Sequence, residues 1–327
     1  MKKKAIKLIF INIFFILSLF LVIEYAIYKK AVVDYKNHHN GIAEIIPPPT
    51  FLESYKIQYY PQTIQYFNTQ KKLDIRPFER NKDNTKKPIL IFGCSFANGS
   101  TFLEDKQAPA HKLSKLTKRN VYNFAMNGCG LQHMLYITQH CLEKYMPQNE
   151  KPEFAIYFYI PNHLQRLQVN IFPNIFFNGT VLHYNLKNSQ LKLEQKNNSF
   201  IYQTFLTKWI YYTIDKQREI NIEQNKHYNF VLTETILKET KKELETRYPN
   251  IKFIIVRYQI EDDDTFREVP NMWEKLEQEG FTIINSEDLI GRKFKYQSED
   301  TTIDKYHPSE KAWDILLPPL IKKINIQ

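Results

Sequence analysis

Five short apolar runs, each ending at a polar or glycine-containing turn, constrain the fold of this 327-residue chain more than any other feature. They span residues 88–92, 121–125, 154–160, 252–256 and 281–284. Short continuous runs rich in branched and aromatic residues are typical of strands buried on both faces of a parallel sheet. Stretches with helical character separate or follow them, at 105–118, 130–146, 231–247, 271–279 and 310–317. This alternation predicts an α/β domain with about five parallel strands.

The same pattern predicts how the chain is organised. Residues 1–30 form an apolar segment with basic flanks, and residues 31–86 form a polar, aromatic-dotted stretch that we interpret as a stalk or lead-in. The α/β domain is expected to occupy residues 87–327. Residues 165–230 break the strand–helix rhythm, so they predict an insertion between the third and fourth strands.

The amino-terminal segment is apolar enough to enter a membrane. Lysines precede a run from Leu8 to Ile23, and Lys29 and Lys30 follow it. About 20 apolar residues cross the hydrocarbon layer as a helix. The pattern fits both a cleaved signal peptide and an uncleaved transmembrane anchor, and the lack of an A-x-A-like small-residue site favours the anchor. The more basic amino-terminal flank is expected to stay in the cytoplasm, which places the domain outside it.

Composition excludes several classes of protein. Hydrophobic residues make up 43% of the chain, which excludes disorder as its main state. Much of the net charge of +10 comes from the lysines around the apolar segment, so a nucleic-acid partner is not expected. The three cysteines, Cys94, Cys129 and Cys141, are too few for a disulfide framework and lack metal-ligand spacing. No metal or cofactor is predicted.

A serine follows the first predicted strand. Ser95 lies two residues after Gly93, on a turn that Gly99 closes. In open parallel sheets, sites form at the carboxyl ends of the strands, so this hydroxyl is expected above the sheet. A serine hydroxyl is a weak nucleophile that needs an adjacent base. Taken alone, Ser95 is better explained as the amino-terminal cap of a helix.

A possible base lies near the end of the chain. The segment Asp304-Lys305-Tyr306-His307-Pro308-Ser309 precedes a helical stretch. A histidine at a helix entrance can reach the carboxyl edge of the sheet. An aspartate three residues before it can accept the N–H of the ring, which fixes the tautomer and stabilises the imidazolium. Asp304 and His307 are therefore candidate partners of Ser95.

Taken together, these motifs resemble those of the SGNH (GDSL-like) hydrolase family. The segment Gly93-Cys94-Ser95-Phe96 is similar to the first block of that family, and residues 123–130 (Asn-Phe-Ala-Met-Asn-Gly-Cys-Gly) are similar to the second. Asp304-x-x-His307 matches the last block. The resemblance covers about residues 88–325. It is supported by the order of the three motifs, which follow the expected strands.

The resemblance implies a fold and a set of roles. The fold would be a three-layer α/β/α flavodoxin-like domain. Ser95 would be the nucleophile, His307 its base and Asp304 the partner of the histidine. The main-chain N–H groups of Ser95 and Gly128 and the side-chain amide of Asn162 would form the oxyanion hole.

The third block departs from the family pattern. After the third strand the chain reads Ile160-Pro161-Asn162-His163 where the family has Gly-x-Asn-Asp. Asn162 can still supply the side-chain donor, although a turn-forming asparagine after proline is the alternative. The segment resembles a variant in bacterial SGNH-like proteins in which His and Arg recur, so His163 and Arg166 are candidate substrate-binding residues. Arg166 could bind a carboxylate or phosphate, or form an ion pair beside the sheet.

These inferences predict a membrane-anchored serine esterase. The expected substrates are small acyl esters, preferably O-acetyl esters of carbohydrate or lipid in the bacterial cell envelope. This choice comes from the family resemblance and the location, since no pocket residue identifies a substrate. Two alternatives stay open: an O-acetyltransferase that uses the same residues, and a non-catalytic envelope scaffold or glycan-binding protein with this fold.

Overall fold

The computed structural model describes residues 2–38, 86–99, 103–126, 129–167, 183–188, 190–194, 206, 226–261 and 271–326. All five predicted strands are present, as β1 (Ile89–Phe92), β2 (Val121–Asn123), β3 (Phe154–Tyr159), β6 (Lys252–Arg257) and β7 (Thr282–Asn285). They form one parallel sheet in the order β2-β1-β3-β6-β7. The structure thus confirms the predicted α/β class and its parallel sheet.

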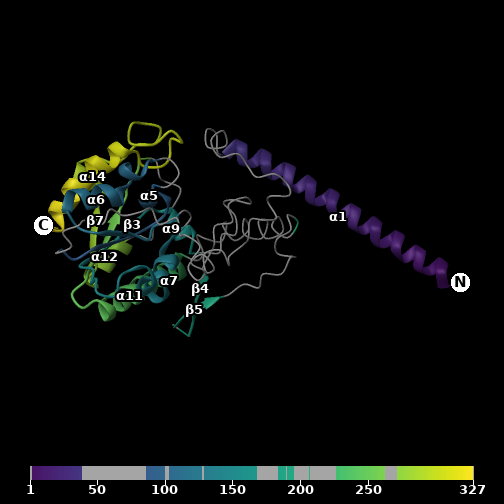
Figure 1. Cartoon of the computed structure of the whole chain (residues 1–327), viewed down its shortest axis with the longest axis horizontal. Helices are drawn as coiled ribbons and strands as arrows, with labels where there is room; N and C mark the ends of the chain where they lie inside the picture. Colours follow the sequence, from purple (N-terminus) through teal and green to yellow (C-terminus); the bar gives the residue numbers. More distant parts are fainter. Residues whose placement is uncertain are drawn as a thin grey trace.

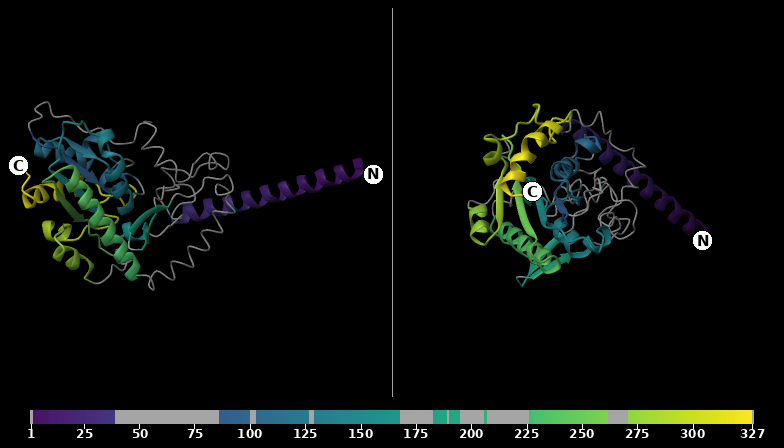
Figure 2. Two further views of the ribbon diagram at one scale, coloured as in Figure 1. Left: turned by 90° about the horizontal axis from the view of Figure 1, so that it is seen from below. Right: turned by 60° about the vertical axis from the view of Figure 1, so that its left-hand side comes forward.

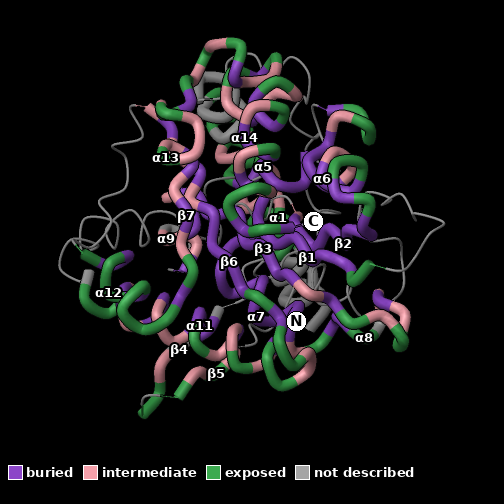
Figure 3. The backbone as a smooth tube through the Cα atoms, turned by 90° about the vertical axis from the view of Figure 1, so that its left-hand side faces the viewer, coloured by how far each residue is buried: buried purple, intermediate pink, exposed green. Residues whose placement is uncertain are grey.

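Helices cover both faces of the sheet, which gives three layers (Figures 1 and 3). Leu90 and Phe92 face a core shared with α7 (Leu131–His140), α11 (Lys226–Arg247) and α12 (Met272–Gln278). Ile89 and Ile91 face a second core shared with α6 (Pro109–Thr117) and α14 (Glu310–Lys323). Because successive strand residues point to opposite faces, an apolar run without polar alternation fills both cores.

Several helix boundaries differ from the prediction. The stretch 105–118 divides into a 3₁₀ turn (Asp105–Gln107) and α6, which begins with Pro109 at its first position. Proline is favoured there because the N–H that it lacks has no partner inside the helix. The stretch 130–146 divides at Cys141 into α7 and α8 (Leu142–Tyr145). Helix α11 begins at Lys226, inside the predicted insertion.

Helix α14 continues through two prolines. The predicted helix ends at Leu317, before Pro318 and Pro319, whereas α14 extends to Lys323. A proline inside a helix removes a hydrogen bond and costs about 3 kcal/mol. Leu317 and Leu320, which flank the proline pair, are fully buried against the sheet. Tertiary packing on both sides of the prolines therefore holds the helix together.

The amino-terminal helix α1 (Lys2–His38) projects away from the α/β domain (Figures 1 and 2). Within the described part of the chain, its segment Ile11–Lys30 is the one helix long and apolar enough to cross a membrane. Its large apolar side chains are exposed, Phe14 by 73% and Phe15 by 67%. The helix extends eight residues past the predicted boundary at Lys30. Residues 39–85, which hold most of the predicted stalk, lie outside the described residues.

The predicted insertion contains a small antiparallel pair of strands. Strands β4 (His183–Lys187) and β5 (Gln190–Glu194) pair with each other in a separate sheet. Apart from these strands, Asn188 and Leu206, residues 168–225 lie outside the described part.

Gly93 sets the backbone path at the carboxyl end of β1, and its replacement tests that path. Its φ is +152°, and a Cβ there would lie 2.9 Å from the Cβ of Ala97 and 3.1 Å from the carbonyl oxygen of Phe158. We expect Gly93→Ala to lower the free energy of unfolding by about 2–4 kcal/mol, from backbone strain and overpacking together.

Gly291 offers a matched control for this change. Its φ is also positive (+74°), but nothing lies within 4 Å of the Cβ position. Gly291→Ala should cost about 1–2 kcal/mol, from backbone strain alone. Urea unfolding of both variants measures the difference, and equal losses would show that the space around Gly93 is not limiting.

Candidate active site

Ser95 begins the single-turn helix α5 (Ser95–Asn98), directly after β1. Cys94 before it is extended, with φ −105°, and Gly99 after it is left-handed, with φ 68°. The N–H of Gly99 donates to the carbonyl oxygen of Ser95 at 2.9 Å, which closes the turn. Cys94 is fully buried, whereas Ser95 is partly exposed. The turn thus presents the Ser95 hydroxyl at the carboxyl edge of the sheet.

Two buried asparagines attach this turn to the segment after β2. The side-chain amide of Asn98 donates to the carbonyl oxygen of Ala125 at 2.6 Å. The amide of Asn123 donates to the carbonyl oxygen of Ala97 at 3.1 Å, and its oxygen accepts from the N–H of Ala125 at 3.0 Å. The sequence reasoning did not identify either residue. A polar side chain inside the apolar run 121–125 was the available signal for Asn123.

His307 and Asp304 complete a hydrogen-bonded series with Ser95. The Ser95 hydroxyl donates to Nε2 of His307 at 2.7 Å, although the two residues are 212 positions apart. Nδ1 of His307 donates to Oδ2 of Asp304. The structure therefore brings together the three residues that the sequence analysis grouped, at the carboxyl end of β1.

The Asp304 carboxylate is held in its ionised form. Burial alone would raise its pKa, but the hydrogen bond and the charge of His307, with a hydrogen bond from Thr302, outweigh burial and lower the pKa to about 2. An ionised carboxylate can only accept hydrogen bonds. The ring proton of neutral His307 must then lie on Nδ1, which leaves Nε2 free to accept the proton of Ser95.

The loop that carries these residues is shaped around Asp304. Its Oδ1 accepts from the hydroxyl of Thr302 at 2.5 Å and from the N–H groups of Tyr306 and His307 at 3.1 and 3.0 Å. Lys305 adopts a left-handed conformation with φ 64°, which is uncommon for a residue with a side chain. That conformation turns the chain tightly enough for one carboxylate to bind the backbone and the ring of the same histidine.

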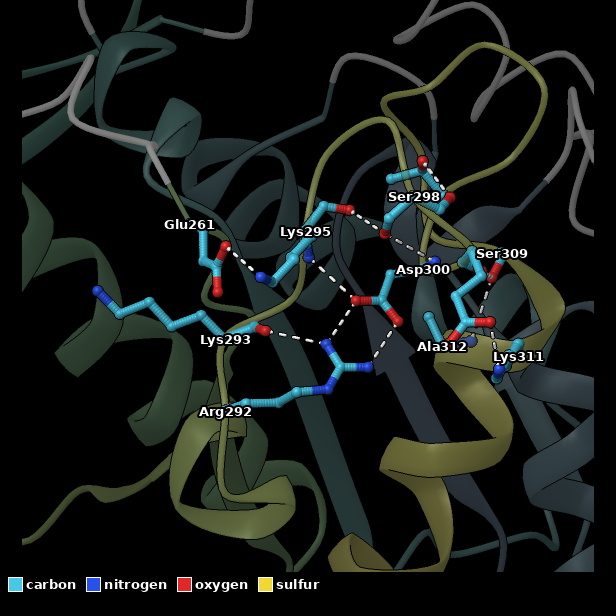
Figure 4. Close-up of polar contacts among 11 residues, drawn as sticks. Glu261, Arg292, Lys293, Lys295, Ser298, Asp300, Ser309, Lys311 and Ala312 are labelled. Carbon is cyan, nitrogen blue, oxygen red and sulfur yellow. Dashed lines mark hydrogen bonds and ion pairs between the residues drawn. The ribbon is translucent and has the colours of Figure 1, made fainter.

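A second buried aspartate supports the loop from behind. Asp300 accepts two hydrogen bonds from the guanidinium of Arg292, at 2.5 and 2.8 Å, and one from the N–H of Lys295 at 3.0 Å (Figure 4). The hydrogen bond from Arg292, despite the opposing effect of burial, lowers the pKa of Asp300. Paired in this way, Asp300 can remain ionised while 1% exposed.

Ser309 connects this support to helix α14. Its N–H donates to the carbonyl oxygen of Asp300 at 2.8 Å, and its hydroxyl donates to that of Glu299 at 2.6 Å. The same hydroxyl oxygen accepts from the N–H of Ala312 at 3.2 Å and so caps α14 (Figure 4). The position of His307 is thus fixed relative to a helix that packs on the sheet.

Aromatic side chains flank the histidine. The ring of Phe96, which is 2% exposed, lies 5.2 Å from the ring of His307 and 5.4 Å from that of Tyr306. Tyr306 stacks on Tyr296 with ring centroids 5.2 Å apart. Phe96, the residue after Ser95, therefore packs against the ring of His307.

A narrow pocket opens beside the Ser95 hydroxyl. It is lined by three polar residues and by four small or apolar ones: Ser95, Thr302 and His307, with Phe96, Gly99, Leu103 and Pro308.

The predicted oxyanion donors are described only in part. The amide nitrogen of Asn162, at the start of α9 (Asn162–Gln165), donates to the hydroxyl of Tyr306 at 3.2 Å, while its oxygen is buried without a hydrogen-bond partner. Asn162 is therefore connected to the His307 loop through Tyr306. Gly128 lies outside the described residues.

His163 is a core residue in the structure. It is 0% exposed, its Nδ1 lies 2.5 Å from the hydroxyl of Tyr157, and its ring packs against Tyr157 and Tyr159. Burial, aided by the charges of Arg166 and His133, keeps its pKa well below the ordinary value. A neutral, enclosed imidazole does not agree with the expectation that His163 contacts substrate directly.

The side chain of Arg166 forms a hydrogen bond with the protein main chain. Its Nη1 donates to the carbonyl oxygen of Cys129 at 2.5 Å. Its own carbonyl oxygen accepts from the side-chain amide of Gln132. Among the residues that the structure describes, no carboxylate pairs with Arg166, so the alternative of an ion pair beside the sheet is not seen there.

Comparisons with known proteins find similar folds. No family model matches the sequence, and no curated protein matches it. The chain is similar to the crystal structure of TesA, with 12% identity and a TM-score of 0.43 over 74% of this chain and 100% of that one. It is similar to a family two carbohydrate esterase from Clostridium thermocellum in complex with cellohexaose, with 8% identity and a TM-score of 0.43 over 75% and 66% of the two chains.

A third similar structure is a putative lipolytic protein of the G-D-S-L family from Desulfitobacterium hafniense, with 10% identity and a TM-score of 0.39 over 72% and 99% of the two chains. Of these three structures, the last is described as a member of the G-D-S-L family, which the sequence motifs resemble. At such low identity the likeness concerns the fold, and function must be argued from the site itself.

Proposed function

We propose that this chain is a serine esterase that hydrolyses small acyl esters. The observation that carries this proposal is the hydrogen-bonded series from Ser95 through His307 to Asp304. A nucleophile, a base and a group that orients the base, in contact in this order, are the requirements for nucleophilic acyl transfer. The partly exposed serine is accessible to a substrate, and the fully buried carboxylate side chain of Asp304 can orient the histidine.

The chemistry follows from the tautomer of His307. Ser95 Oγ attacks the ester carbonyl carbon while Nε2 of His307 takes the hydroxyl proton. The carbonyl oxygen becomes an oxyanion, for which the N–H of Ser95, the N–H of Gly128 and the amide of Asn162 are the proposed donors. The ester C–O bond then breaks, and His307 returns the proton to the departing alcohol. Water, deprotonated by the same nitrogen, releases the acid and restores Ser95.

The proposed substrates follow from the expected location of the domain and from the family resemblance. Helix α1 carries the basic flank that favours retention in the cytoplasm, so the domain would lie outside the cytoplasm as a membrane-anchored enzyme. There it would meet carbohydrate and lipid of the cell envelope. The preference for a short acyl group such as acetyl comes from the family resemblance and from this location.

Labelling with a fluorophosphonate probe tests the proposed nucleophile. Ser95 Oγ would displace fluoride from phosphorus while His307 takes the proton, so we expect one covalent adduct, located by peptide mass spectrometry on Ser95. His307→Ala should slow labelling by at least about 100-fold, since general-base help is typically worth 10²–10⁴. A folded protein without an adduct on Ser95 would instead support a non-catalytic scaffold.

A further inference from the structure

The loop after β2 is held by two local hydrogen bonds and by one from a distant residue. The N–H of Cys129 donates to the carbonyl oxygen of Met126 at 3.1 Å, which closes a turn. The N–H of Gly130 donates to Nδ1 of His133 at 3.1 Å. Both N–H groups are therefore used inside the loop and its following helix α7. The carbonyl oxygen of Cys129 instead accepts from Arg166, which lies beyond the next strand at the end of α9.

Arg166 forms hydrogen bonds with this loop and with α7 through both its side chain and its main chain. The guanidinium binds the Cys129 carbonyl oxygen at 2.5 Å, and the Arg166 carbonyl oxygen accepts from the side chain of Gln132. The packing is close, because a Cβ at Gly130 would lie 3.4 Å from the Cβ of Arg166. These contacts connect the ends of β2 and β3, the two strands on either side of β1 and Ser95.

The charge of Arg166 acts on its buried neighbours. Burial raises the pKa of the Cys129 thiol to about 12, and the charge of Arg166 opposes this rise. The same charge acts to lower the pKa of both Tyr157 and His163. Burial is the larger effect on each, so the pKa of Tyr157 is raised and that of His163 is lowered. No carboxylate of the described residues neutralises this cation, so its field favours negative charge nearby.

We propose that Arg166 is a positioning residue for the oxyanion hole. By holding the Cys129 carbonyl oxygen, it fixes the residue that follows the proposed donor Gly128 in the sequence. This inference rests on the proposed function, and it replaces direct substrate binding by Arg166. The two roles differ in kinetics, since loss of a substrate contact raises KM, whereas loss of transition-state stabilisation lowers kcat.

The kinetic test compares Arg166→Met with Arg166→Lys and a matched control. We expect Arg166→Met to lower kcat for p-nitrophenyl acetate by about 10- to 100-fold, less than complete loss of one oxyanion donor, with KM nearly unchanged. Arg166→Lys keeps the charge and a donor, so it should recover a large part of kcat. The control, Arg119→Met, also loses a bond to a carbonyl oxygen, that of Lys87, but leaves the site untouched and should keep wild-type kcat.

A second measurement does not need turnover. Amide hydrogen exchange of peptides within residues 126–135 should accelerate in Arg166→Met and stay unchanged in Arg119→Met. Thermal unfolding identifies variants that fail to fold, in which case Arg166→Lys is compared with the wild type. Unchanged exchange, or a rise in KM at constant kcat, would overturn the positioning role. A wild-type chain without esterase activity would refute the proposed function, and the exchange experiment would still decide whether Arg166 holds the loop.

Discussion

Ser95→Ala is expected to abolish turnover of p-nitrophenyl acetate while the protein stays folded. Losing the nucleophile of such a series lowers kcat by about 10⁴–10⁶. Ser95 is partly exposed, and its hydroxyl contacts Nε2 of a half-buried His307, so its removal leaves no enclosed polar group. Initial rates and urea unfolding of the same preparation measure both effects.

Ser114→Ala is the matched control for this variant. Ser114 is fully buried on α6, and its hydroxyl donates to the carbonyl oxygen of Arg119 at 2.7 Å. Its loss should cost about 1–2 kcal/mol of stability, because a buried acceptor loses its partner, but leave kcat unchanged. Comparable kcat in Ser95→Ala and the wild type would remove Ser95 from the proposed role.

The central sheet could be predicted because the residues of each strand are themselves apolar enough to indicate burial on both faces. The run Phe154–Tyr159 is apolar or aromatic throughout, and every residue in it is buried. Such a run fits the middle of a parallel sheet covered on both sides. The carboxyl-edge rule then places Ser95, after β1, at one edge of the sheet. The Asp304-x-x-His307 motif at a helix entrance could be related to Ser95 because both resemble blocks of the same family.

Features that depend on contacts between distant segments could not be predicted. The bond from Asn98 to Ala125 and that from Arg166 to Cys129 cross 27 and 37 positions of sequence. Nothing local to Arg166 distinguishes a partner in the protein from a carboxylate or phosphate of a substrate. The continuation of α14 through Pro318 likewise depends on leucines packed against a sheet that local helix rules do not include.

Asp304→Asn should lower kcat by about 10⁴-fold, although the side chain keeps its size. An asparagine directs either its amide oxygen or its amide N–H groups at Nδ1 of His307. Where the N–H groups face the ring, Nδ1 must accept and the proton moves to Nε2, which then cannot take the proton of Ser95. Even with the oxygen facing the ring, no negative charge remains to stabilise the imidazolium. Initial rates with p-nitrophenyl acetate measure the loss.

The same variant has a defined effect on acid stability. Because the folded pKa of Asp304 is about 2 and the unfolded value is about 3.9, the ionised carboxylate stabilises the fold above about pH 4. That contribution is lost as the pH falls through the folded pKa towards 2. Asp304→Asn lacks it at every pH, so its free energy of unfolding should lie below that of the wild type at pH 7, and the gap should narrow between pH 4 and 2. Urea titrations across this range measure the gap, and a constant gap would show that the charge of Asp304 does not stabilise the folded loop.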